Sequence, residues 1–160
     1  MSRLSAVIIS RNDENVDILN RTILSLNTFI NSFDEVVFVD WNSNVPTLDV
    51  IRNNIFAKGK LKHIVVTPDQ VKTITEHRTD MPNINQPLAR NVGLRRCTGD
   101  ILVSTNIDIL CPHRPIIDQF TLDHNKFYTI PRRNFHLQHI MQFQKINDIV
   151  DFLLQHQQHF

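Results

Sequence analysis

Two apolar runs, SAVIIS at Ser5–Ser10 and EVVFVD at Glu35–Asp40, decide the fold class of this 160-residue chain. Each is a continuous stretch rich in β-branched residues, which is typical of strands buried on both faces of a parallel sheet. KHIVVT at Lys62–Thr67 and ILVS at Ile101–Ser104 predict two further strands. Strands that alternate with helical patterns predict an α/β domain built on a Rossmann-like, mostly parallel sheet with flanking helices.

Helical spacing appears between these strands. The segment after the first strand carries one apolar stripe, formed by Val16, Leu19, Ile23, Leu26 and Ile30. Asn12 or Asp13 is the expected N-cap of that helix. Pro46 is expected at the first position of a short helix after the second strand.

The second half of the chain is less regular. Residues 69–87 show no clean period and predict a long loop that holds no more than about one helical turn. Residues 88–97 predict a helix, with Gly99 at its C-terminal end. Residues 136–160 carry an unbroken helical stripe. We therefore expect a sheet domain over residues 1–135, followed by a C-terminal amphipathic helix over residues 136–160. This helix would pack on the sheet domain or on a partner, and a partner of the second kind could be another copy of the chain in a homodimer.

Composition narrows the function classes. Lys and Arg number 17 and Asp and Glu number 16, a balance that argues against a nucleic-acid-binding protein. No run approaches 18 apolar residues, so the sequence predicts no membrane span. Cys97 and Cys111 form neither a disulfide framework nor a zinc motif. These features predict a cytoplasmic protein, in the host cytoplasm if the chain is viral.

Polar residues follow each expected strand, where parallel sheets bind ligands. Asn106 and Asp108 end the fourth strand, and two oxygen-bearing side chains at that spacing can hold Mg²⁺ or Mn²⁺. A simple strand-end turn is the alternative for this pair. Asp40 ends the second strand, where a carboxylate either accepts from a ribose or base or starts a turn.

The order SAVIISRNDE, EVVFVDWNSN and PLARNVGLRRCTGDILVSTNIDIL resembles the nucleotide-sugar-binding half of GT-A glycosyltransferases, especially family-2-like enzymes. That family pattern has a strand ending in N-E or N-D and a strand ending V-D-x-x-S. A helix A-R-N-x-G then leads into a strand ending D-x-D. The matches, within residues 4–133, are Asn12, Asp13, Asp40, Ser43, Ala89, Arg90, Asn91, Gly93, Gly99, Asp100, Asn106 and Asp108.

The resemblance implies a donor-binding set, formed by Ser10, Arg11, Asn12, Asp40, Arg90, Asn91, Asn106 and Asp108. Asp40 would contact the base or ribose, and Asn91 and Gly93 would shape a turn that lets the backbone approach the nucleotide. Asp108, with Asn106, would hold Mn²⁺ or Mg²⁺, whose charge stabilises the diphosphate leaving group. The implied donor is a nucleotide-diphosphate sugar, with UDP favoured over GDP.

Two departures from the family pattern limit this reading. The first position of D-x-D is the neutral Asn106, and residues 109–160 contain no convincing catalytic-base motif. The catalytic residue is therefore left unassigned. The chain reads as the donor-binding part of a metal-dependent glycosyltransferase, within a longer enzyme or an oligomer, with a glycan, protein or lipid acceptor. The alternative is a non-catalytic nucleotide-sugar-binding or protein-interaction module of the same fold.

Two other function classes fit the sequence less well. A sugar-phosphate nucleotidyltransferase would need a Gly-rich loop after the first strand, where SRNDEN has no glycine. A phospho-acceptor receiver domain would need an acidic pair at the end of that strand, where Arg11 and Asn12 stand instead.

Overall fold

The computed structural model describes residues 2–55, 58–75 and 83–111, together with residues 114, 118, 123, 125–129, 148 and 152. Within these residues the chain forms one four-stranded, all-parallel sheet in the order β3-β2-β1-β4. Its strands are β1 (Leu4–Ser10), β2 (Glu35–Trp41), β3 (Leu61–Val66) and β4 (Ile101–Asn106). The expected α/β, Rossmann-like fold class is confirmed.

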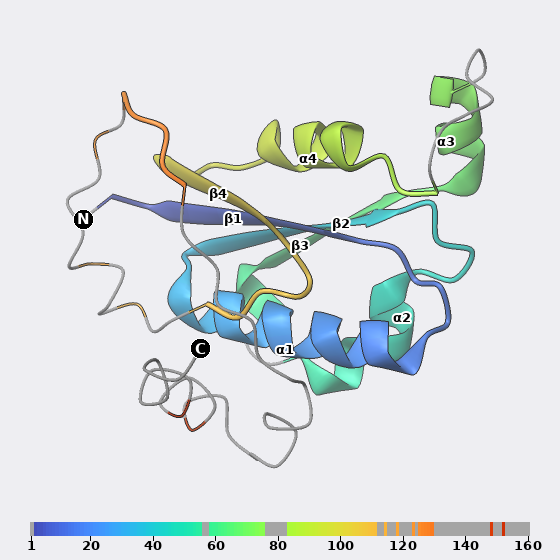
Figure 1. Cartoon of the computed structure of the whole chain (residues 1–160), viewed down its shortest axis with the longest axis horizontal. Coiled ribbons are helices and arrows are strands. Elements are labelled where there is room, and N and C mark those ends of the chain that lie inside the picture. Colours follow the sequence, from blue (N-terminus) through green and yellow to red (C-terminus); the bar gives the residue numbers. More distant parts are fainter. Residues whose placement is uncertain are drawn as a thin grey trace.

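Helices cover both faces of this sheet (Figure 1). On one face lie α1 (Val16–Ser32) and α2 (Thr47–Ile51), and on the other lies α4 (Gln86–Leu94). The helix α3 (Pro68–Thr75) follows β3 at the carboxyl end of the sheet. Two short 3-10 turns, η1 (Arg52–Asn54) and η2 (Lys58–Lys60), precede β3.

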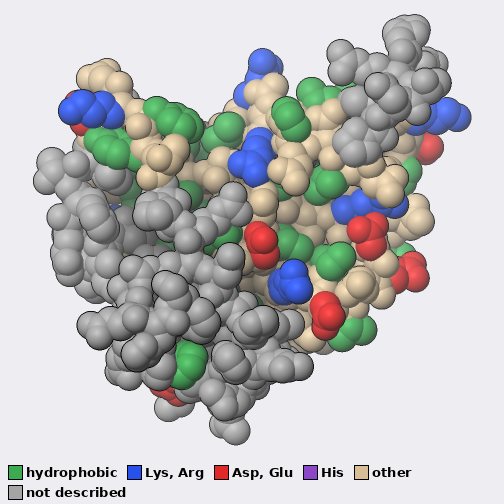
Figure 2. Space-filling model, viewed as in Figure 1, with side chains coloured by type: hydrophobic (Ala, Val, Ile, Leu, Met, Phe, Trp, Pro, Cys, Tyr) green, Lys and Arg blue, Asp and Glu red, His purple; other side chains and the backbone are tan. Residues whose placement is uncertain are grey.

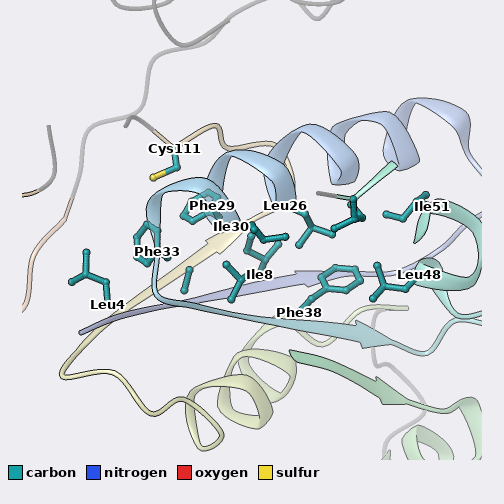
Figure 3. Close-up of a cluster of buried hydrophobic side chains, with 13 residues drawn as sticks. Leu4, Ile8, Leu26, Phe29, Ile30, Phe33, Phe38, Leu48, Ile51 and Cys111 are labelled. Atoms are coloured by element: carbon teal, nitrogen blue, oxygen red, sulfur yellow. The ribbon is translucent and has the colours of Figure 1, made fainter. Parts of the chain in front are cut away.

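The core therefore has two halves, one on each face of the sheet. Between the sheet and α1, Ile8, Leu26, Ile30 and Phe38 pack together with at most 1% of their surface exposed (Figure 3). Beneath α4, a second cluster is formed by Val7, Ile9, Val37, Val39, Trp41, Val66 and Ala89. Every residue of β1 and β2 is buried, as expected for strands covered on both faces.

Gly93 sets how closely α4 approaches the sheet. A Cβ atom at this position would lie 2.4 Å from Val7 Cγ1 and 3.0 Å from Val39 Cγ2. Gly99 has a different reason from the expected helix cap, because α4 ends at Leu94 and no glycine adopts a positive φ in the described chain. A Cβ at Gly99 would lie 2.6 Å from Ser5 Oγ and 2.7 Å from the Ser5 backbone nitrogen, so the close approach of Ser5 explains this glycine.

Three predicted boundaries are corrected. Asn15, not Asn12 or Asp13, caps α1, since its side chain accepts from the backbone N–H groups of Asp17 (2.9 Å) and Ile18 (3.2 Å). Pro46 is the residue before α2 and not its first residue. The expected loop at residues 69–87 instead contains α3, and its last two residues belong to α4.

Strand order places a topological switch between β1 and β4. From β1 the chain crosses to β2 and β3 on one side, and then returns to β4 on the other. In open parallel sheets, ligands bind beyond the carboxyl ends of strands at such a point. Ile9 is the β1 partner of Asn106, so Arg11 and Asp108 follow these neighbouring strands at the same edge.

Two remaining features bear on partners. No helix among the described residues is long and apolar enough to cross a membrane. Acidic and basic side chains are interspersed over the described part of the face in Figure 2. The expected C-terminal helix, the dimer contact through it and the boundary at residue 135 lie outside the described residues, apart from the isolated Asp148 and Phe152.

Candidate functional site

Asp40 is the buried centre of a hydrogen-bonded scaffold at the end of β2. Its carboxylate, with no exposed surface, accepts from the Ser43 hydroxyl and from the backbone N–H of Thr47 at the start of α2. His63 Nε2 of β3 lies 3.5 Å from Asp40 Oδ2, and the His63 ring stacks on Phe38 with centroids 5.5 Å apart. Asp40 thus holds the loop between β2 and α2 in place through buried hydrogen bonds.

Electrostatics at Asp40 favour the carboxylate form. Burial raises the pKa of Asp40, but the contacts with His63, Ser43 and Thr47 outweigh burial and hold that pKa below its ordinary value of 3.8. The charge is therefore held by partners inside the protein. In this structure Asp40 presents no surface to a base or ribose.

Asn12 joins the β1 loop to the same scaffold. Its backbone N–H donates to Ser43 Oγ at 2.8 Å, and its Nδ2 donates to the Val45 carbonyl at 3.0 Å. Its Oδ1 accepts from the backbone N–H of Glu14 at 2.9 Å, and Glu14 has a positive φ of 58°. Asn12 is only 6% exposed, so its polar atoms brace the loop from inside.

Ser10 is also internal. It is 2% exposed and pairs with Asp40 across β1 and β2. Ser10, Asn12 and Asp40 are thus brought together, as the sequence predicts for strand ends at one edge. They are brought together as a support beneath the loops, not as an exposed surface.

A second, half-buried part of the site is formed by Arg90, Asn106 and their neighbours. Arg90 projects from α4 toward β4, and its Nη2 donates to Asn106 Oδ1 at 2.7 Å. Nη1 lies 3.4 Å from Ser104 Oγ, and Nη2 also lies 3.3 Å from Gln86 Oε1. These partners are all neutral, and no described carboxylate lies within ion-pair distance of Arg90.

Arg11 stands at the end of β1. Its Nε lies 3.0 Å from Asp13 Oδ1, and 21% of its side-chain surface is exposed. The Nη1 atom is buried and has no hydrogen-bond partner among the described residues. Buried guanidinium N–H groups are rarely left without an acceptor, so this atom is an exception among the buried donors of the described residues.

The expected metal site fits poorly. Asn106 Oδ1, the oxygen that would bind Mn²⁺ or Mg²⁺, already accepts from Arg90, so a cation there would meet a guanidinium of the same charge. Asp108 is exposed and supplies one carboxylate. No group of three or more metal-binding side chains occurs among the described residues. The residues therefore do not fit a divalent ion held between Asn106 and Asp108.

Asn91 and Gly93 lie inside α4, not in a turn. Asn91 is exposed, and its Oδ1 accepts from Arg95 Nε at 3.2 Å. Gly93 is buried against Val7 and Val39. The expected turn that would bring backbone to the nucleotide is therefore absent at these two residues.

Sequence reasoning missed His63, Thr47 and Ser104. Nothing in the sequence around His63 indicates that β3 would place its ring beside Asp40. Thr47 follows Pro46 at the start of a helix, which marks its N–H as one that needs an acceptor. Ser104 is two residues before Asn106 on a strand and so shares its face, a signal that period-two spacing does carry.

Part of the chain is similar in structure to two solved proteins. Residues 1–349 of TarS from S. aureus give a TM-score of 0.43 at 20% identity, covering 73% of this chain and 30% of that one. A mannosyltransferase, PcManGT from Pyrobaculum calidifontis in complex with GDP-Man and Mn²⁺, gives 0.46 at 22% identity, covering 72% and 30%. The chain thus spans less than a third of either structure's length.

Searches by sequence give a different result. No protein-family model matches the chain, and no curated protein matches it. The site offers the half-buried guanidinium group of Arg90 and, from the end of the neighbouring strand, that of Arg11, and guanidinium groups are suited to binding phosphate oxygens.

Proposed function

We propose that this chain binds a nucleotide-diphosphate sugar at the carboxyl edge of β1 and β4 and is the donor-binding part of a glycosyltransferase. The single observation that carries the proposal is the hydrogen bond from Arg90 to Asn106 at the topological switch of a parallel sheet, where Arg11 follows the neighbouring strand β1. Ligands of such sheets bind at this place. The resemblance of the strand and helix motifs to GT-A glycosyltransferases supports the same assignment.

The chemistry of sugar transfer explains why cations belong here. Breaking the bond between the sugar and the diphosphate leaves negative charge on the departing phosphate oxygens. Fixed positive groups directed at these oxygens lower the barrier, because they need no reorganisation as the charge develops. Arg11 and Arg90 would supply this charge, while Asp40 and Asn12 would keep the surrounding loops in place.

The acceptor, the catalytic base and the reaction's stereochemistry are not assigned to residues of this chain. Its role as proposed is to hold and orient the donor. Transfer would then require an acceptor-binding part from elsewhere in a longer protein or from a partner. Binding of the donor without transfer by this chain is the expected behaviour in isolation.

The test is a thermal-shift panel with UDP, GDP, CMP and their sugars, each with Mn²⁺, Mg²⁺ or EDTA. A ligand at a hundredfold its dissociation constant stabilises a protein by about 2.7 kcal/mol, which raises the midpoint by roughly 5 °C at this size. A shift for one nucleotide and its sugar would support the proposal and identify the base. UDP and GDP are both tested, and neither is assumed to be the donor nucleotide. Absence of any shift at millimolar ligand would contradict it.

A further inference from the structure

Arg90 carries a positive charge that no described residue neutralises. Its three side-chain partners, Gln86, Ser104 and Asn106, are uncharged. The shortest contact, 2.7 Å from Nη2 to Asn106 Oδ1, fixes one edge of the guanidinium against β4. A charged aspartate at position 106 would hold Arg90 equally well but would cancel its charge. The asparagine holds the guanidinium and leaves the charge available to a ligand.

Arg11 supplies a second cation on the neighbouring strand. Asn106 pairs with Ile9 across β1 and β4, and Arg11 comes two residues after Ile9. With about 3.3 Å per residue along a strand and about 4.8 Å between strands, the Arg11 and Asn106 backbones lie roughly 8 Å apart. Long arginine side chains from these positions can reach the same diphosphate. In this structure Arg11 is paired with Asp13 through Nε, and its Nη1 is buried without a hydrogen-bond partner among the described residues.

We infer that Arg11 and Arg90 together form a diphosphate subsite that works without a divalent cation, with Asn106 as the residue that positions Arg90. This inference rests on the proposed function for the identity of the nucleotide, but the anion subsite itself does not. Two arginines can bind phosphate oxygens with paired, charge-assisted hydrogen bonds. Asp108, the exposed carboxylate beyond β4, then repels the diphosphate and holds no metal against it.

The two interpretations of this edge predict opposite results for Asp108. If Asp108 holds a metal that carries the diphosphate, Asp108→Asn abolishes binding. If the arginines carry the diphosphate, Asp108→Asn leaves binding in EDTA unchanged or strengthens it, because one negative charge is removed. Asp13, which contacts Arg11 Nε, is left in place in every variant.

The experiment is calorimetric titration of the protein with inorganic diphosphate, UDP and GDP, in EDTA and in Mn²⁺. We expect the wild type to bind diphosphate in EDTA within about tenfold of its affinity in Mn²⁺. Arg90→Gln and Arg11→Gln each weaken this binding by about tenfold or more, the loss expected when a charge-assisted contact is removed. Arg90→Lys keeps the charge without the planar fork and gives an intermediate loss.

Asn106 and a matched control separate positioning from general damage. Asn106→Ala frees Arg90 and is expected to weaken diphosphate binding several-fold, while a thermal midpoint near that of the wild type shows that the fold is intact. Arg95→Gln is the control, since Arg95 is an exposed arginine at the end of the same helix, bound to Asn91. It is expected to bind diphosphate as the wild type does.

The outcomes distinguish this inference from the proposed function. Diphosphate binding in EDTA that depends on Arg90, with no preference for any nucleotide, supports the subsite and contradicts the proposed nucleotide-sugar function. Nucleotide binding that requires Mn²⁺, fails in Asp108→Asn and is unaffected in Arg90→Gln overturns the inference and leaves the proposed function standing. No diphosphate binding under any condition overturns the inference as well.

Discussion

At the scale of single residues, Asp40 shows how a strand-end carboxylate can be held inside the protein by hydrogen bonds to its own loops. Its described contacts are all with groups of the protein, namely Ser43, Thr47 and His63. The Ser43 hydroxyl also accepts a hydrogen bond from the Asn12 backbone N–H, which joins the β1 loop to Asp40. The family motif predicts that Asp40 binds the nucleoside. In the structure its carboxylate is buried and holds two loops in place.

Substitution of Asp40 tests this supporting role through stability. Hydrogen bonds to a buried charge contribute roughly 1.5–3 kcal/mol each, so we expect Asp40→Asn to lower the free energy of unfolding by about 2–3 kcal/mol at pH 7. Asp49→Asn, an exposed carboxyl in the first turn of α2, is the control and is expected to cost less than about 1 kcal/mol. Urea unfolding followed by circular dichroism measures both.

The same pair of variants has a defined pH dependence. Because the folded-state pKa of Asp40 lies below its ordinary value of 3.8, its stabilisation is fully present above that value. It is lost as the pH falls through the lower, folded-state pKa. The stability gap between the wild type and Asp40→Asn should therefore be constant from pH 7 to 5 and shrink below pH 4. A gap of the same size at pH 3 would contradict the account.

At the scale of elements, the strands could be predicted from the sequence and several connections could not. The runs of β1 and β2 are hydrophobic enough to be buried on both faces, which places them at the covered centre of a parallel sheet, whereas the edge strands β3 and β4 are largely half-buried. The helix α3 was missed because its turns carry few apolar residues and no buried one, so no periodic stripe marks it. Asn15 was missed as the cap because several capping residues precede Val16.

The sequence predicts which strand ends lie at one edge of the sheet, but not which of their side chains lie inside the protein. Strand ends at one edge follow from parallel pairing, which correctly groups Ser10, Asp40 and Asn106. Which side chains face inward depends on the loops that follow each strand, and no local pattern encodes that choice. The contact between Arg90 and Asn106 joins a helix to a strand 16 residues later, so neither motif alone reveals it.

Close packing of α4 on the sheet gives a prediction at this scale. Gly93→Ala puts a Cβ within 2.4 Å of Val7 Cγ1, a side-chain atom in the middle of a buried strand. We expect it to lower the free energy of unfolding by about 1–3 kcal/mol, the usual cost of overpacking a core. Thermal and urea unfolding measure the effect.

Two further variants make that prediction specific. Gly59→Ala in η2 is the matched control, because a Cβ there meets no atom within 4 Å and should leave stability nearly unchanged. The double variant Gly93→Ala with Val7→Ala removes the clashing methyl groups. If its stability falls by the sum of the two single losses, with no rescue, the steric explanation is wrong.

At the scale of the whole molecule, the residues that hold the loops in place differ from those proposed to contact a ligand. Buried residues at the ends of β1 and β2 fix the loops, while Arg90 reaches from α4 to Asn106 at the end of β4, and Arg11 stands at the end of β1 beside Asp13. The opposite, amino edge of the sheet is closed by structural hydrogen bonds. There Glu35, whose pKa is held low by Ser5 and Thr98 despite burial, joins β2 to the turn before β4. Ligand binding is therefore expected at one edge only.

The most direct test of this account is an amide NMR titration of the protein with UDP and GDP in EDTA. We predict saturable chemical-shift changes in the residues that surround the proposed subsite, namely residues 11–13, 86–90 and 104–108. The amides of Ser5, Glu35 and Thr98 at the amino edge should stay unchanged. Shifts concentrated at the amino edge, or no shift at the β1 and β4 ends at millimolar nucleotide, would contradict the central claim that this sheet edge binds the donor without a divalent cation.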